Sequence, residues 1–126
     1  MSRARAARKS KLGDLVATAQ SRFNRVTARK VRMLADAICG LTVAEADQQL
    51  AALHRPSAMP VVSNLLKSAV ANAKEKEEDH PEELVIGEIF ADAGPMLKRF
   101  RPAPMGRGVR VRKRMSHVTI KLFKQG

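Results

Sequence analysis

The feature that most limits how this chain can fold is a basic stretch near its C-terminus, residues 97–118, which holds eight Lys and Arg residues and no acid. Two strand-like runs flank a break at residues 102–108, where two Pro and two Gly fall within seven positions. Pro and Gly interrupt the regular hydrogen bonding of a strand, so the break is expected to form a turn. Two strand-like runs joined by such a turn pair most simply as an antiparallel β-hairpin. We expect each arm to run about ten residues beyond the body, roughly 33 Å at the rise of a strand.

Neither face of this hairpin has enough apolar side chains to pack along its length on a core. Arg110, Arg112 and Arg114 are two positions apart and therefore share one face of their strand. The alternate positions on that strand are mixed in character: Val109, Val111 and Lys113. An isolated two-stranded ribbon is only marginally stable in water. We therefore expect the arm to project and to be supported by phosphates, which would cancel its self-repulsion and release counterions.

The charge of the whole chain is unevenly distributed. The formal net charge is +12 and the sequence pI is near 10.9. Residues 1–11 carry +5, residues 12–92 carry −3 and residues 93–126 carry +10. A nearly neutral body with two cationic ends indicates a polyanionic partner, nucleic acid before an anionic membrane surface. The longest apolar stretches are far short of a membrane span, so we expect no membrane association.

The first residues, 1–13, are predicted to form a flexible basic arm. They lack the apolar core of a secretory signal. Their Arg and Ser content without acids vaguely resembles an organelle transit peptide, but the segment is short and runs straight into the folded part. We expect a cytoplasmic protein, with an organelle as the less favoured location.

No combination of side chains points to catalysis or metal binding. Cys39 is the only cysteine, which excludes an intramolecular disulfide and fits a reducing compartment. His54, His80 and His117 have no paired ligand spacing, and the acidic run at 75–83 is interpreted as a solvated connector. No nucleophile–base pair, phosphate-cradling loop or carboxylate dyad has supporting context. We expect no enzyme activity, no metal and no cofactor.

The remainder, residues 14–126, is predicted to be a single domain that includes the extended hairpin at about 94–120. Apolar residues at helical spacing predict three helices, at about 28–39, 43–53 and 58–75. Strand-like runs are expected over roughly 17–25, 84–91 and 109–123. In the last run three apolar residues alternate with polar ones, which we interpret as a half-buried edge strand: Val118, Ile120 and Leu122.

Residues at the predicted helix ends are suited to capping. Thr27 and Ser57 are expected N-caps of the first and third helices, since a hydroxyl can accept from a free backbone N–H. Thr42 and Glu45 match the capping box of the second helix. Gly40 is a natural stop for the first helix.

Basic residues crowd the start of the first predicted helix. Arg29, Lys30 and Arg32 lie in its first turns, where cations oppose the helix dipole. The arrangement becomes favourable if a phosphate lies at that helix end.

The predicted contacts are to RNA backbone and shape. Trp and Tyr are absent and Phe100 is the only aromatic residue near the hairpin tip, so a broad base-stacking platform is not expected. Arg outnumbers Lys in the hairpin, which favours bidentate phosphate contacts and stacking. The residues expected to contact RNA are Arg25, Arg29, Lys30, Arg32, Lys98, Arg99, Arg101, Arg107, Arg110, Arg112, Lys113, Arg114 and His117.

Five short blocks of the sequence occur together, in this order and spacing, in one known family. They are Arg29–Arg32, Leu66–Ala73, Gly94–Pro102, Met105–Arg107 and Arg112–Thr119. Over roughly residues 17–123 the chain strongly resembles the bacterial-type large-subunit ribosomal protein L-twenty-two. The resemblance implies an α+β fold, with three helices packed on a small three-stranded antiparallel sheet and a long protruding basic β-hairpin.

The same resemblance implies a function and a set of partners. It implies a structural constituent of the large ribosomal subunit that binds large-subunit ribosomal RNA and supports assembly. The hairpin would line the peptide exit tunnel, with neighbouring ribosomal proteins and the nascent peptide as further partners and no homo-oligomer.

The hairpin tip is where the resemblance implies contact with the tunnel and an effect on macrolide response. The tip residues are Phe100, Pro102, Ala103, Pro104, Met105, Gly106 and Gly108. The chain departs from the family here: one tip Arg is absent, and Pro104 and Gly108 are unusual. At the first helix it has Thr27-Ala28 where the family usually has Ser-Pro.

Another class of protein also carries basic β-arms with a Pro at the tip. An architectural DNA-bending protein can wedge such a residue between base steps, and it usually dimerises through its helical body. A solution dimer that prefers duplex DNA over structured RNA would favour this alternative.

Overall fold

The last strand of the chain is the centre of the sheet. The computed structural model describes residues 12–53, 55–76, 79–102 and 104–125. In it, β3 (Gly108–Gln125) pairs antiparallel with both β1 (Leu12–Asn24) and β2 (Val85–Pro102), in the order β1-β3-β2. The expectation of an edge strand is therefore wrong. Apolar alternation shows only that one face of a strand is covered, and a central strand with one covered face has the same pattern.

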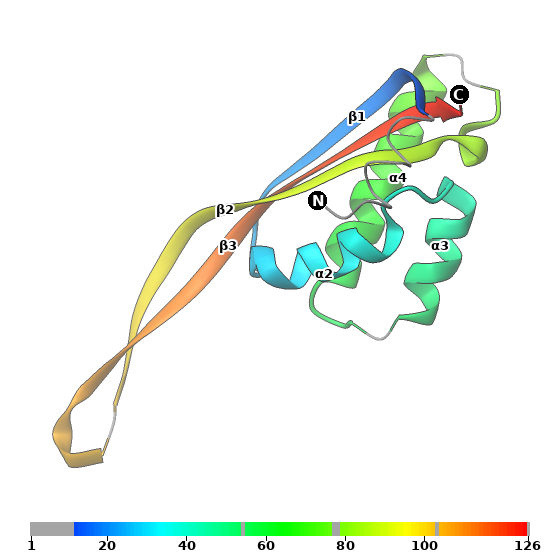
Figure 1. Ribbon diagram of the computed structural model, residues 1–126. Helices are drawn as coiled ribbons and strands as arrows, with labels where there is room; N and C mark the ends of the chain where they lie inside the picture. The colour runs from blue at the N-terminus through cyan, green and yellow to red at the C-terminus, as the bar shows by residue number, and fades with distance from the viewer. Residues whose placement is uncertain (1–11, 54, 77–78, 103, 126) are drawn as a thin grey trace.

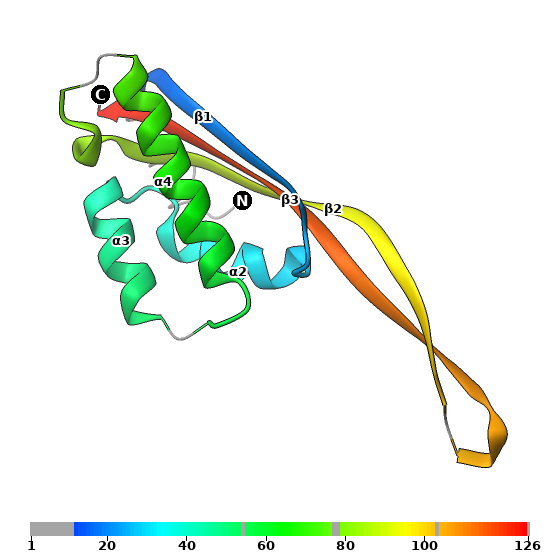
Figure 2. The same ribbon diagram turned by 180° about the vertical axis from the view of Figure 1, so that it is seen from behind.

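Three helices lie on one side of this sheet, as Figures 1 and 2 show. They are α2 (Ala28–Ile38), α3 (Val43–Ala52) and α4 (Met59–Glu75), each within a residue or two of its predicted bounds. The helix α4 packs against β1 and β3, α2 packs against β2 and β3, and α3 packs on the other two helices. The core between the layers contains Leu34, Leu66 and Ile120, all essentially inaccessible to solvent. The predicted α+β architecture is confirmed.

The helix caps agree with the sequence in two places and differ in two. Thr42 and Glu45 form the predicted capping box, with both N–H···O distances at 3.3 Å. Gly40 follows α2 with φ of +87°, a conformation that glycine adopts without strain. Thr27 occupies the N-cap of α2, but its hydroxyl makes no capping bond.

The N-cap of α4 is Ala58 and not Ser57. The amide of Met59 already donates to the carbonyl oxygen of Arg55 (2.9 Å), so a turn precedes the helix and supplies an acceptor that a side-chain cap would otherwise provide. The prediction for Ser57 is wrong because this turn forms between residues that the helical pattern does not include.

The strand β1 begins earlier than its local sequence predicts. The expected strand covered residues 17–25, whereas β1 starts at Leu12, opposite Gln125 of β3. Pairing with β3 holds residues 12–16 in the sheet, and that pairing is not visible in the local pattern. Residues 12 and 13 thus belong to the strand and not to the predicted arm, and residues 1–11 lie outside the described part of the chain.

The sheet continues as a two-stranded ribbon that projects from the body (Figure 1). The last pair of β1 with β3 is Asn24–Ser116, so eight residues of β3, 108–115, extend beyond the three-stranded part. The pairing of β2 with β3 runs without interruption from Met96–Arg114 to Pro102–Gly108. The predicted hairpin is therefore confirmed, and its arms extend roughly 26 Å at strand rise.

The hairpin reverses at its tip through a short turn, η2 (Pro104–Gly106). Met105 and Gly106 both have positive φ, at 67° and 70°. Ala103, one of the predicted tip residues, lies outside the described residues.

The acidic run after α4 ends in a second short turn, η1 (Pro81–Glu83), whose Pro81 is buried. No helix among the described residues is long and apolar enough to cross a membrane. The same residues contain no group of three His, Cys, Asp or Glu side chains that could hold a metal ion. His54 lies outside them.

Candidate nucleic-acid interface

The ribbon carries cations on both of its faces. Residues directly opposite each other in an antiparallel pair share a face. One face therefore carries Lys98 opposite Arg112 and Phe100 opposite Arg110, and the other carries Arg99 opposite Val111. All eight Lys and Arg side chains of the ribbon are exposed: Lys98, Arg99, Arg101, Arg107, Arg110, Arg112, Lys113 and Arg114.

Direct apposition of like charges makes the free ribbon unfavourable. Lys98 and Arg112 face each other on neighbouring strands, a placement that destabilises a sheet in water. Large apolar side chains near the tip do not compensate, since Phe100 is 75% exposed and Met105 is 95% exposed. The ribbon can therefore gain stability from an anionic surrounding, as the sequence predicts.

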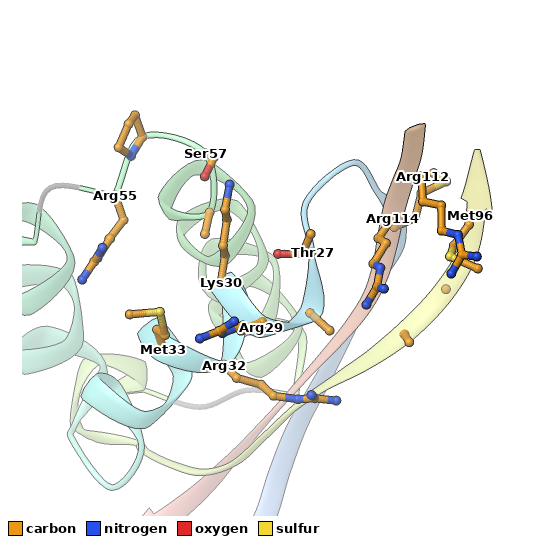
Figure 3. A pocket seen from close by; sticks show the side chains of 16 residues that line it. Thr27, Arg29, Lys30, Arg32, Met33, Arg55, Ser57, Met96, Arg112 and Arg114 are labelled. Carbon is orange, nitrogen blue, oxygen red and sulfur yellow. The ribbon is translucent and has the colours of Figure 1, made fainter. Parts of the chain in front are cut away.

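At its base the ribbon meets the start of α2 across a groove of about 980 Å³, which we call the root groove (Figure 3). Its walls come from the first turns of α2, from the connector before α4, and from β2 and β3. Six of the described lining residues are cations and none is acidic: Arg29, Lys30, Arg32, Arg55, Arg112 and Arg114.

A second hollow of about 370 Å³ adjoins the root groove where the chain passes from β1 to α2. It shares Lys30, Arg112 and Arg114 with the root groove and adds Arg25 and Lys113. The two hollows thus form one basic surface that leads from α2 onto the ribbon.

Arg32 is held against the sheet. Its guanidinium donates from Nε and Nη2 to the carbonyl oxygen of Ala91 in β2, at 3.1 and 2.8 Å. The interaction fixes α2 to the strand that forms the opposite wall of the root groove. Because a guanidinium has five N–H donors, Arg32 keeps further donors for a ligand.

His117 has a structural position at the ribbon base. Its Nδ1 accepts from the backbone N–H of Phe23 at 3.1 Å, and the two rings meet edge to face with centroids 5.0 Å apart. Phe23 has a φ of 57°, within an irregular stretch of β1 between Ser21 and Asn24. A Cβ on Gly94 would lie 3.2 Å from Nε2 of His117, so a side chain there would crowd the ring. The ring thus holds the end of β1 against β3, and its contact with RNA stays a prediction.

The structure divides the predicted RNA-binding residues other than His117 into two groups. Around the root groove and the adjoining hollow it brings together Arg25, Arg29, Lys30, Arg32, Arg112, Lys113 and Arg114. Along the ribbon it places Lys98, Arg99, Arg101, Arg107 and Arg110. The first group combines residues of the N-terminal half of the chain with residues of β3. The second group combines residues from the two opposite arms of the ribbon.

The sequence predicted no binding role for Arg55, Met33 or Met96, which line the root groove. Arg55 is a lone cation before a Pro, and nothing in its local pattern indicates a site. Met33 and Met96 are 50% and 42% exposed. The sequence did offer a sign for Met33: it is an apolar residue on the polar face of α2, between Arg32 and the buried Leu34.

The protein-family model described as ribosomal protein L22p/L17e matches residues 19–123 of the chain. The match includes both hollows, the ribbon and its tip.

Proposed function

The chain belongs to the ribosomal protein L22p/L17e family, and from this premise we propose that it binds large-subunit ribosomal RNA through the root groove and the ribbon. Membership implies a structural role in the large ribosomal subunit, in a family that is not an enzyme family. The proposal assigns that role to particular surfaces. It also includes support of subunit assembly.

The observation that carries the proposal is the ribbon without an apolar face. Lys98 lies directly opposite Arg112, and neither side of the ribbon can be buried on a protein core. Phosphates around the ribbon would turn this repulsion into attraction and release counterions. Binding and ordering of the ribbon would then be one event.

The tip is proposed to line the peptide exit tunnel, as the family resemblance implies. The thin two-stranded form supports this, because a ribbon can enter narrow spaces in folded RNA that are too small for a helical body. Met105 and Phe100 present apolar surface at its end, which suits contact with a passing peptide. Neighbouring ribosomal proteins are the other expected partners.

The test is deletion of residues 98–114 from the full chain. The body core lies in the helices and the three-stranded part, so the helical circular dichroism signal and the melting of the body should persist. Cells that depend on this variant should accumulate immature large subunits in sucrose gradients. A control that replaces two exposed cations of α4, Lys67→Ala with Lys74→Ala, should assemble normally.

Normal subunit maturation, tunnel shape and growth after the deletion would contradict the proposal. Nothing in the family match or the described residues favours the DNA-bending alternative. It would gain support only if the protein were a dimer that bound duplex DNA more tightly than structured RNA at the same salt concentration.

A further inference from the structure

We infer that the root groove receives one unstacked nucleotide of the ribosomal RNA, with its base against an exposed methionine side chain of one wall and its flanking phosphates on the surrounding cations. This inference rests on the proposed function. It adds a local recognition mode to a surface otherwise expected to read only backbone and shape.

The root groove is large enough to hold a nucleotide. Its volume of about 980 Å³ lies at the upper end of the range for sites that hold small organic ligands, roughly 300–1,000 Å³. A nucleotide within a helix is stacked on both sides and cannot enter such a site. An extruded nucleotide can, and sequence-dependent RNA recognition usually targets unstacked bases of this kind.

The apolar part of the root groove has a chemistry that suits a base. Met33 follows Arg29 by one turn of α2, and Met96 of β2 lies diagonally across from Arg112 of β3, so a thioether and a guanidinium share a face on each wall of the groove. Figure 3 shows Met33 on the α2 wall and Met96 on the wall of the ribbon. Sulfur makes favourable contacts with aromatic rings, and guanidinium planes stack on bases. Each wall of the groove thus offers a base an apolar surface beside a cation.

The polar part of the root groove suits the phosphates on either side of that base. Arg29 and Arg55 approach from one wall and Arg112 and Arg114 from the other (Figure 3). The start of α2, which lines the same groove, has no side-chain cap and no acid in its first turn. Its free N–H groups therefore add to an anion site that the cations define.

The nucleotide belongs to a polymer because the basic surface does not stop at the groove. Lys30, Arg112 and Arg114 also line the adjoining hollow, and Lys113 continues from there onto the ribbon. A free mononucleotide would leave this continuation unused. An RNA strand would follow it, with the extruded nucleotide as a fixed point.

The experiment measures binding of the full chain to a large-subunit ribosomal RNA transcript at several salt concentrations. The variant Met33→Ala with Met96→Ala should bind about tenfold more weakly, as expected for the loss of one base contact, with an unchanged salt slope. The matched control is Leu15→Ala, an exposed apolar residue of β1 that lines neither hollow, which should bind like the unmodified protein. Arg55→Gln with Arg114→Gln should instead lower the salt slope by about two phosphate contacts.

A base-specific probe provides the second readout. Dimethyl sulfate modification of the bound RNA should show an unpaired base that the unmodified protein protects and the double methionine variant exposes. Adenosine monophosphate at millimolar concentration should not displace the RNA.

The outcomes separate this inference from the proposed function. If the double methionine variant binds and protects the RNA like the unmodified protein, the strand crosses the groove by phosphates alone and the inference is wrong, whereas the proposed function stands. Displacement by the free mononucleotide would also overturn it. If the unmodified protein does not bind the transcript, both fail together.

Discussion

Ser116 stands out among the single residues because it is a polar side chain with no accessible surface, placed where β1 leaves the sheet. Its Oγ has no hydrogen-bond partner among the described residues, although Asn24 Nδ2 donates to the Ser116 carbonyl oxygen at 3.3 Å. A buried hydroxyl without a partner costs free energy, since it gives up water and gains nothing in return.

We therefore predict that Ser116→Ala raises the free energy of unfolding by about 1 kcal/mol, the lower range of that cost. Chemical denaturation of the full chain measures it. Ser57→Ala, at an exposed hydroxyl, is the control and should change stability by less than about 0.5 kcal/mol. A loss of stability at Ser116 would show that the hydroxyl has a partner in solution.

At the scale of the helices, two threonines at equivalent positions have different roles. The hydroxyl of Thr42 accepts from Glu45 N–H and completes a capping box, whereas that of Thr27 makes no capping bond. The sequence alone does not distinguish them, since both precede a helix.

This difference gives a matched pair of variants. Thr42→Ala should lower the free energy of unfolding by about 1 kcal/mol, the usual value for a lost N-cap. Thr27→Ala should leave it almost unchanged. Equal losses in thermal or urea melts would mean that Thr27 also caps its helix in solution.

In the ribbon, a substitution that raises stability is expected to weaken RNA binding. Lys98→Glu would place an acid directly opposite Arg112 and replace a repulsive pair by an attractive one. The free ribbon should then exchange its amide hydrogens more slowly, and binding to ribosomal RNA should weaken. Hydrogen exchange and a binding titration measure the two effects.

The control for the ribbon variant is Lys67→Glu, which makes the same charge change on the exposed side of α4. It should leave ribbon exchange unaltered. Faster exchange in the Lys98→Glu ribbon would show that the facing cations do not limit its stability.

For the whole molecule, the separation of a nearly neutral body from a cationic ribbon predicts how salt acts. The body holds −3 between residues 12 and 92, and the segment 93–126 holds +10. Salt should therefore weaken RNA binding far more than it changes folding of the body.

If six to ten phosphates are contacted, affinity for ribosomal RNA should fall about 10³–10⁵-fold between 50 and 200 mM salt. Filter binding across that range measures it, with melting of the free protein over the same range as the control. A nearly flat salt dependence would count against phosphate contacts as the main source of affinity.

The sequence by itself determined the features that depend on neighbouring residues. The helices follow from apolar spacing and from local signals such as Thr42, Glu45 and Gly40. The hairpin follows from strand runs around a Pro- and Gly-rich break, and its lack of an apolar face follows from the alternation of Arg with mixed side chains. Each of these properties is determined by residues close together in the sequence, and the tertiary contacts are consistent with them.

Only the tertiary structure decided what depends on pairing between distant segments. The central position of β3 and the start of β1 at Leu12 arise from ladder bonds between the two ends of the chain. The root groove arises in the same way, because Arg29 and Arg55 meet Arg112 only after α2 packs on β2. Local pattern indicates which residues are basic and exposed, but packing determines which of them face the same ligand.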